Sequence, residues 1–178
     1  MSVFFDSLEL KFRIVSEDSD IEKLLIYRNE DHVRASMFYD KLICRADHMR
    51  WYQNLDKNNN FYYIYSRCDE DVGVVNIKDV DRVKGKAEVG IFVSNQKYLG
   101  SYLNIAALLY VYGIAFNELA LSELWATILP SNVRAIRMNR SLGFIPHESA
   151  DNKFVLSKRT YQTKTIKYME KIGKSIKI

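Results

Sequence analysis

Residues 94–102 join an extended segment to a long helical pattern through a turn that contains Gly100. A helix that begins after a turn presents backbone N–H groups without intrahelical acceptors, and these donors and the helix dipole suit a phosphate or pyrophosphate. Gly100 allows close approach of a ligand, Ser101 offers a hydroxyl and Lys97 a positive charge. The turn therefore indicates a phosphate site, although many helices that bind nothing begin in the same way.

A second turn and helix lie further along the chain. Pro130 ends an extended segment, and Ser131 and Asn132 are residue types that cap the helix expected at residues 133–142. Gly143 then follows, as is common where a helix ends.

The elements that must position these turns follow from the spacing of apolar residues. The pattern predicts strands at 8–14, 61–67, 73–79, 87–93 and 122–129, two closing strands at 144–146 and around 161–169, and helices at about 21–28, 45–54, 100–119 and 133–142. The breaks at 68–71 and 81–86 are short and charged, which favours an antiparallel meander of three strands. Gly90 lies inside the third of these, where a glycine marks a bulge or a close approach.

This order of elements predicts an α/β (α+β) fold. We expect a single mixed, mostly antiparallel sheet with helices on both faces, and one domain that spans residues 1–178.

Composition narrows the classes of protein. The chain has 48% hydrophobic and 27% charged residues, as is ordinary for a soluble domain, and no apolar run is long enough to cross a membrane. The net charge of +4 fits an anionic ligand and equally fits no special partner, and no nucleic-acid-binding module accompanies it. Cys44 and Cys68 form neither a disulfide framework nor a metal-binding spacing, so we expect reduced thiols, no metal and a cytoplasmic protein.

The stretch from Trp125 to Phe144 resembles the strand–helix signature of the GNAT superfamily of N-acetyltransferases. The features shared are Asn132 at the start of a helix, Ala135 three residues later and the pair Gly143-Phe144 after it. The turn at 96–102 stands where that family has its pyrophosphate loop, although only Gly100 is retained cleanly. Residues 28–30, 37–38 and 48–51 are similar to a branch that contains the sugar-nucleotide N-acetyltransferases of the pseudaminic acid pathway and, more distantly, the ribosomal-protein alanine N-acetyltransferases.

The resemblance implies acetyl-CoA as the acetyl donor, bound in an opening between two central parallel strands that a bulge forces apart. The residues implied in cofactor binding are Ile91, Phe92, Val93, Lys97, Leu99, Gly100, Ser101, Tyr102, Leu103, Asn132, Ala135 and Asn139.

The resemblance also implies catalytic roles. An amine like that of lysine is about 99.9% protonated at pH 7, so a base must remove a proton before it can attack. Glu88 is the first candidate for this base and His48 the second, while a solvated strand carboxylate and a packed histidine remain the ordinary alternatives. Asn139 stands where the family commonly has a tyrosine that protonates the leaving thiolate. Asn139 can only donate a hydrogen bond, so either the thiolate leaves without a general acid or another tyrosine, such as Tyr102, supplies the proton.

The acceptor implied by the sugar-nucleotide branch is a small amine, a nucleotide-linked amino sugar. The site that binds this acceptor would be lined by Arg28, Met37, Phe38, Tyr39, His48 and Trp51. These side chains could equally be core residues. Two alternatives stay open: an enzyme that acetylates protein N-termini, and a non-catalytic module that binds acyl-CoA. The sequence also leaves a homodimer open.

Overall fold

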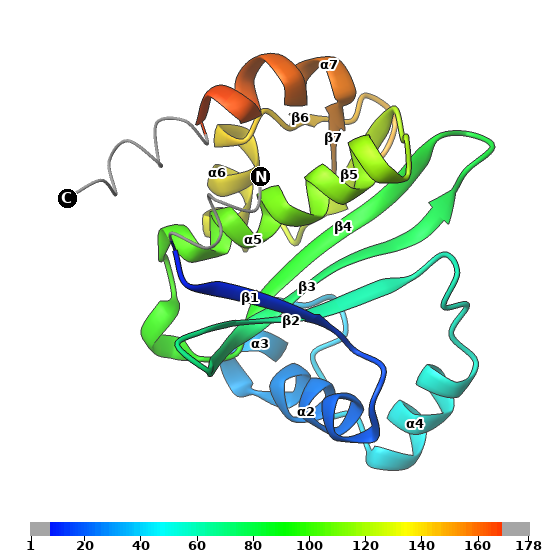
Figure 1. Cartoon of the computed structure of the whole chain (residues 1–178), viewed down its shortest axis with the longest axis vertical. Helices are drawn as coiled ribbons and strands as arrows, with labels where there is room; N and C mark the ends of the chain where they lie inside the picture. Colours follow the sequence, from blue (N-terminus) through cyan, green and yellow to red (C-terminus); the bar gives the residue numbers. More distant parts are fainter. Residues whose placement is uncertain (1–7, 169–178) are drawn as a thin grey trace.

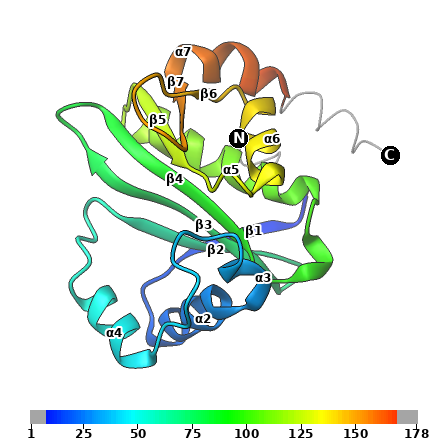
Figure 2. The ribbon, with the colours of Figure 1, turned by 180° about the vertical axis from the view of Figure 1, so that it is seen from behind.

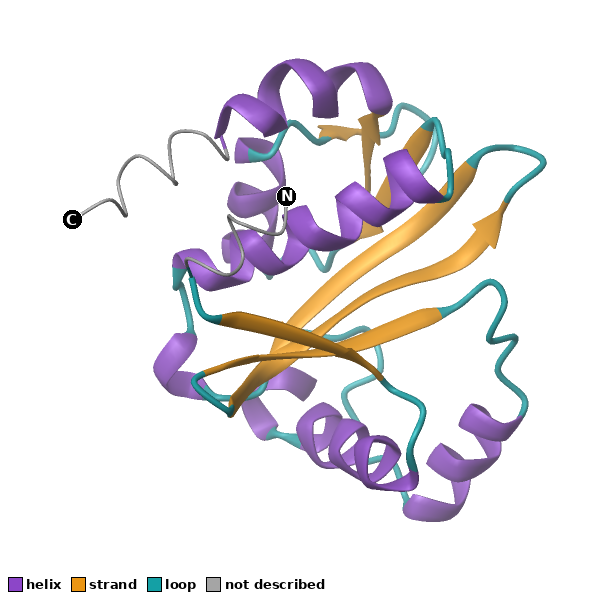
Figure 3. Ribbon diagram, viewed as in Figure 1, coloured by secondary structure: helices purple, strands orange, loops and turns teal. Residues whose placement is uncertain are grey.

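Seven strands form one sheet in the order β1-β2-β3-β4-β5-β7-β6 in the computed structural model of the protein, which describes residues 8–168 (Figures 1 and 3). The strands are β1 (Leu10–Ile14), β2 (Phe61–Arg67), β3 (Glu70–Asp81), β4 (Lys86–Val93), β5 (Glu123–Thr127), β6 (Ile145–Pro146) and β7 (Lys153–Ser157). Every neighbouring pair is antiparallel except β4 and β5, which are parallel. The predicted mixed sheet and the meander β2-β3-β4 are therefore confirmed.

Helices cover both faces of this sheet, as predicted (Figure 1). Those before the meander are α2 (Asp18–Asn29), α3 (Asp31–Arg34) and α4 (Arg45–Gln53), and those after it are α5 (Tyr102–Gly113), α6 (Val133–Ser141) and the short α7 (Lys158–Thr160). A π-helical segment, η2 (Ile114–Glu118), extends α5. None of the helices within residues 8–168 is long and apolar enough to cross a membrane.

Alternation along the strands assigns each side chain to one face. Val75, Val89 and Leu124 pack with α5 and α6 in the larger core, and we call this side the α5 face. Val74 and Phe92 pack with α2 and α4 in a smaller core, and we call this side the α2 face. Residues two apart on a strand share a face, which places the polar residues of β3, β4 and β5 described below.

The end of the chain differs from the prediction. Strand β7 was not predicted, although Phe154 and Leu156 alternate as buried residues there. The strand expected around 161–169 is wrong over its described part, because residues 158–168 are helical and Met169 lies outside the described residues. Tyr161 and Thr165 are both buried four residues apart, which is the spacing of one helical face.

Helix α6 begins and ends where the sequence predicts. The Asn132 side chain accepts a hydrogen bond from the Ala135 amide, which satisfies one of the free donors at the helix start. Gly143 follows the helix with a φ of 98°, a left-handed conformation that glycine adopts without strain.

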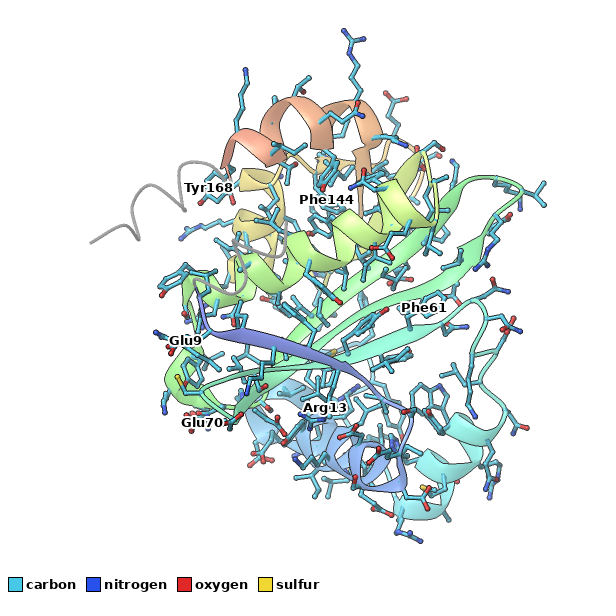
Figure 4. All side chains as sticks on the ribbon, in the orientation of Figure 1. Glu9, Arg13, Phe61, Glu70, Phe144 and Tyr168 are labelled. Carbon is cyan, nitrogen blue, oxygen red and sulfur yellow. The ribbon has the colours of Figure 1, made fainter. Side chains whose placement is uncertain are left out.

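A network of charges joins β1, α2 and β3 on the α2 face. Asp71 accepts hydrogen bonds from Arg13 at 3.0 Å and 3.1 Å, from Lys23 at 2.9 Å and from the Tyr27 hydroxyl at 2.7 Å. Figure 4 labels Arg13 between the sheet and α2. Burial alone would raise the pKa of Asp71, but these hydrogen bonds outweigh it and lower the pKa to about 2. The network ties the first strand and helix to the sheet.

Asp71→Asn is expected to lower the free energy of unfolding by about 2 kcal/mol at neutral pH. Because the pKa of Asp71 in the folded chain lies below its ordinary value of 3.8, this stabilisation is present above about pH 4 and is lost as the pH falls towards about 2. Urea denaturation of wild type and variant at both pH values tests this. Asp69→Asn is the control, since Asp69 and its partner Lys11 are both exposed; an equal loss in the two variants would contradict the prediction.

Candidate active site

Strands β4 and β5 part after a short parallel pairing. They pair at Lys86 with Glu123, Ala87 with Leu124 and Glu88 with Trp125. Beyond Glu88, β4 continues to Val93 against β3, while β5 stays paired with β7, and Figure 2 shows the two ribbons diverging. The backbone groups of a strand point alternately to its two neighbours, so within residues 8–168 those of 89–93 that point towards β5 have no strand partner. These groups can bind an extended ligand that contains amides.

The predicted residues Ile91, Phe92 and Val93 all lie in the part of β4 that pairs with β3 and no longer with β5. One of its carbonyls is already engaged, because Nε2 of His32 in α3 lies 2.8 Å from the Val93 oxygen. Beside the end of β5, a hollow of about 280 Å³ is lined by residues that include Pro130, Ile136 and Lys153.

The bulge expected at Gly90 is wrong. The register between β3 and β4 is regular from Gly73–Val93 to Lys78–Glu88 and shifts only between Lys78 and Asp81. Gly90 instead lies beneath a side chain: a Cβ atom there would be 3.1 Å from Oδ1 of Asn76. The parting of β4 from β5 thus occurs without a bulge at this glycine.

The turn before α5 leaves two amides free. Within the described residues, the Leu99 amide donates to the Gln96 carbonyl, the Ser101 amide to the Tyr98 carbonyl and the Leu103 amide to Ser101 Oγ, whereas Gly100 and Tyr102 have no such acceptor. Of the five amides predicted to hold a diphosphate, two are therefore available.

Gly100 itself fits a ligand site. Its φ is +80°, and a Cβ atom added there would meet no protein atom within 4 Å. The space above the backbone is thus open, next to free N–H groups at the start of a helix, which is the geometry that suits the diphosphate of CoA.

A buried hydrogen-bond chain fixes this turn. Asn104 in the first turn of α5 accepts from the Tyr65 hydroxyl at 2.8 Å and donates to the Tyr98 carbonyl at 2.9 Å. Asn104 and Tyr65 are both buried, so the chain connects the turn rigidly to the centre of the sheet.

Lys97 is less free than the sequence suggests. Its ammonium group forms an ion pair with Glu70, which also accepts hydrogen bonds from Asn95 and the Tyr98 hydroxyl. These donors, Lys97 first, lower the pKa of Glu70. Lys97 therefore holds the first half of the turn in place.

The β5 side of the parting contains the predicted residues of α6. Asn132 uses its side-chain oxygen to cap the helix, which leaves its NH₂ group as a donor. The Asn139 side chain is buried and donates to the Ala135 carbonyl at 2.9 Å. This bond uses one of the two N–H groups of the Asn139 side chain.

Glu88 lies at the point where the strands part, on the α2 face. Its carboxylate is mostly buried and lies 3.2 Å from Nζ of Lys78 on β3, so it is not the solvated, unpaired residue that the sequence left open. Nearby, burial raises the pKa of Tyr62 to about 12, and the negative charges of Asp79 and Glu88 act in the same direction. Tyr62 therefore stays protonated at neutral pH and can donate a hydrogen bond.

His48 has a packing environment. It is buried, its Nε2 lies 2.9 Å from the Ile21 carbonyl, and its ring packs against Trp51. Burial lowers the pKa of His48. These contacts join α4 to α2 and favour a structural role over that of a base.

The predicted acceptor residues divide into two groups. Trp51 packs edge-on against Tyr62, which lies on the same face of the sheet as Glu88. Arg28 lies at the end of α2, and its Nη2 donates to the Tyr39 carbonyl at 2.8 Å, next to exposed Phe38. Met37 precedes this pair and is partly buried. Burial, followed by the charge of Arg34, lowers the pKa of Arg28.

Sequence reasoning missed four residues around Glu88. They are Tyr62, Asn76, Lys78 and Trp125, which share the α2 face. Asn76 could have been noticed, because it interrupts the apolar run of β3.

Comparison with protein families assigns the chain to one of them. The profile described as "Acetyltransferase (GNAT) domain" matches residues 9–145, from β1 through the whole of the parting to β6. The chain belongs to the GNAT acetyltransferases. As a GNAT enzyme it is an acyltransferase that uses acetyl-CoA as the acetyl donor and an amine as the acceptor.

Solved structures share the fold of this GNAT chain. Aminoglycoside acetyltransferase AAC(6')-Ib in complex with coenzyme A is 17% identical, with a TM-score of 0.73 over 86% of this chain and 97% of that one. Spermidine N-acetyltransferase from Vibrio cholerae, in complex with CoA and spermine, is 12% identical, with a TM-score of 0.74 over 87% and 99%. A domain from Methanocaldococcus jannaschii is 20% identical, with a TM-score of 0.71 over 82% and 95%. A search among curated proteins found no match.

Proposed function

We propose that this GNAT enzyme acetylates the primary amine of a small molecule by direct attack, with amine and acetyl-CoA bound together. The observation that carries the proposal is the end of β4–β5 pairing at Glu88 and Trp125, which leaves β4 backbone groups free beside a mostly buried carboxylate. Acetyl-CoA supplies the activated thioester when bound. Glu88 takes the proton of the amine, directly or through a water.

The remaining residues bind and orient acetyl-CoA. The amides of Gly100 and Tyr102 bind the diphosphate, and the free groups of residues 91–93 bind the pantetheine amides. A free N–H of β4 near Glu88 polarises the thioester carbonyl. Asn139 donates a hydrogen bond to the departing sulfur, since its NH₂ group has a second hydrogen.

We infer that the acceptor is a nucleotide-linked amino sugar, as in the sugar-nucleotide branch that the N-terminal half resembles. Arg28 supports this class, because its partly buried guanidinium contacts no carboxylate among the described residues and its Nη1 lacks a hydrogen-bond partner. A partly buried guanidinium without a counter-ion suits a phosphate. The exposed rings of Phe38 and Tyr39 beside it suit a nucleobase.

We also propose a setting for the enzyme: one acyltransferase domain in the cytoplasm. The single sheet that contains all seven strands, from β1 at one edge to β6 at the other, supports the single domain.

Release of free thiol from acetyl-CoA in the presence of different amines tests the acceptor class. We expect UDP- or dTDP-linked 4-amino sugars to accelerate release at least about tenfold more than spermidine, an aminoglycoside or a peptide at equal concentration. Arg28→Ala should raise KM for the nucleotide sugar about tenfold or more. Arg50→Ala, at an exposed arginine of α4, is the control. Activity with peptides alone would contradict the small-molecule class.

A further inference from the structure

Two buried polar atoms flank Glu88 without a hydrogen-bond partner in the described part of the chain. They are Oδ1 of Asn76 on β3 and Nε1 of Trp125 on β5. Asn76 is 7% exposed and pairs with Gly90 on β4, two residues from Glu88, while Trp125 pairs with Glu88 itself. Both side chains lie on the α2 face, the side of Glu88. Each of the two strands beside β4 thus contributes one buried polar atom that lacks a hydrogen-bond partner among the described residues.

Neither atom finds a hydrogen-bond partner in its surroundings within residues 8–168. The Asn76 side chain lies over Gly90, where an added Cβ atom would come within 3.1 Å of Oδ1, so the glycine lets Asn76 lie close to β4 beside Glu88. Trp125 is covered by Lys153, whose Nζ lies 3.8 Å from the ring centroid. An ammonium group has no lone pair and cannot accept from the indole N–H. Buried polar groups are nearly always hydrogen-bonded in native proteins, so a pair of exceptions beside a reacting carboxylate needs an explanation.

The two atoms need opposite partners. Asn76 Oδ1 accepts, so its partner must donate, and Trp125 Nε1 donates, so its partner must accept. A hydroxyl group does both. The amine itself, once Glu88 has removed a proton, keeps N–H donors but uses its lone pair in the attack, so it can satisfy Asn76 and not Trp125.

We propose that Asn76 and Trp125 bind the acceptor beside its amine and select amines that carry a hydroxyl on a neighbouring carbon. This inference rests on the proposed function, because it places the amine at Glu88. The amine N–H or the hydroxyl donates to Asn76 Oδ1, and the hydroxyl oxygen accepts from Trp125 Nε1. A simple alkylamine leaves the indole N–H buried and unpaired, and a protonated polyamine nitrogen offers donors only.

The test compares two amines that differ only in this hydroxyl, trans-2-aminocyclohexanol and cyclohexylamine, by thiol release at saturating acetyl-CoA. In the wild type we expect kcat/KM to be about 10- to 100-fold higher for the amino alcohol. Trp125→Phe keeps a ring and removes the donor, and it should bring the ratio close to one by raising KM for the amino alcohol alone. Asn76→Ala should raise KM for both amines, because it removes the acceptor of the amine N–H.

Tyr112→Phe is the matched control. The Tyr112 hydroxyl is also buried without a partner, but it lies in the core on the α5 face, so its removal should leave the ratio unchanged. Thermal unfolding and acetyl-CoA binding of each variant show that the fold and the donor site are intact.

The outcomes distinguish a failure of hydroxyl selectivity from a failure of the proposed acetyltransferase activity. Equal kcat/KM for both amines in the wild type, or an unchanged ratio in Trp125→Phe, overturns the inference and leaves the acetyltransferase proposal standing. If no amine accelerates thiol release although acetyl-CoA binds, the proposed function fails, and the inference fails with it.

Discussion

Glu88→Gln is expected to lower kcat by about 10²- to 10⁴-fold at pH 7, with the Kd of acetyl-CoA within about twofold of wild type. The side-chain amide has nearly the same shape and keeps an oxygen for Lys78, which lies 3.2 Å from the carboxylate, but it cannot take a proton from the amine. Initial rates of thiol release and calorimetric titration with acetyl-CoA measure the two quantities.

The pH dependence separates a base from a structural residue. Without the base, the variant depends on amine that is already neutral in solution, so its rate should rise about tenfold per pH unit up to the pKa of the amine, near 10. The defect should therefore be largest at neutral pH and shrink at high pH. A variant that lost activity through misfolding would show the same relative loss at every pH.

Glu123→Gln provides the matched control. Glu123 lies on β5, two residues before Trp125 and on the same face, and it pairs with Lys86 at 2.9 Å across the same two strands. It differs from Glu88 in lying at the opposite end of the paired stretch, away from the point where β4 and β5 part. We expect kcat of this variant within about twofold of wild type; similar losses in the two variants would refute the assignment of Glu88.

The sequence predicted those helices and strands whose ends are marked by neighbouring residues in the chain. Short charged breaks predicted the meander β2-β3-β4, and Asn132 and Gly143 marked both ends of α6. Strand β7 has only five residues, and it becomes a strand through pairing with β5 along its length. Because β5 is distant from β7 in the sequence, a local sequence pattern cannot reveal this pairing. The helical residues after it were mistaken for a strand because Tyr161 and Thr165 show their common face only once they pack on the core.

The active site shows the same limit. Gly100 and Tyr102 lie in or beside one turn, so a candidate diphosphate site there could be inferred from neighbours in the sequence. The parting of β4 and β5 joins residues more than thirty positions apart, and no local pattern locates its apex at Glu88 and Trp125. The engagement of Lys97 by Glu70 is likewise invisible without the fold, because Glu70 belongs to another strand. Residue types therefore suggested which groups could act, and the topology decided which ones meet.

Gly100→Val is expected to weaken acetyl-CoA binding at least about 100-fold, for two reasons. A φ of +80° costs a β-branched residue about 1–2 kcal/mol or more, which shifts the turn away from the conformation that leaves the Gly100 and Tyr102 amides free. The valine side chain would also extend into the open space above the turn, where the diphosphate must approach. The hydrogen bonds from the Gly100 and Tyr102 amides to the diphosphate would then be lost, and such charge-assisted bonds are worth about 1.5–3 kcal/mol each. Calorimetric titration of the folded variant with CoA measures the effect.

Gly85→Val separates the ligand effect from backbone strain. Gly85 has a φ of +67° and lies in the turn between β3 and β4, where a Cβ atom would crowd Ser122 Oγ at 2.9 Å. This variant should lose stability at least as much as Gly100→Val, yet bind CoA like wild type wherever it is folded. At Gly100 the added Cβ meets no protein atom, so its packing cost is small and its main effect must fall on the ligand. Wild-type CoA affinity in Gly100→Val would mean that the diphosphate binds elsewhere, and the α5 turn would have to be abandoned as its site.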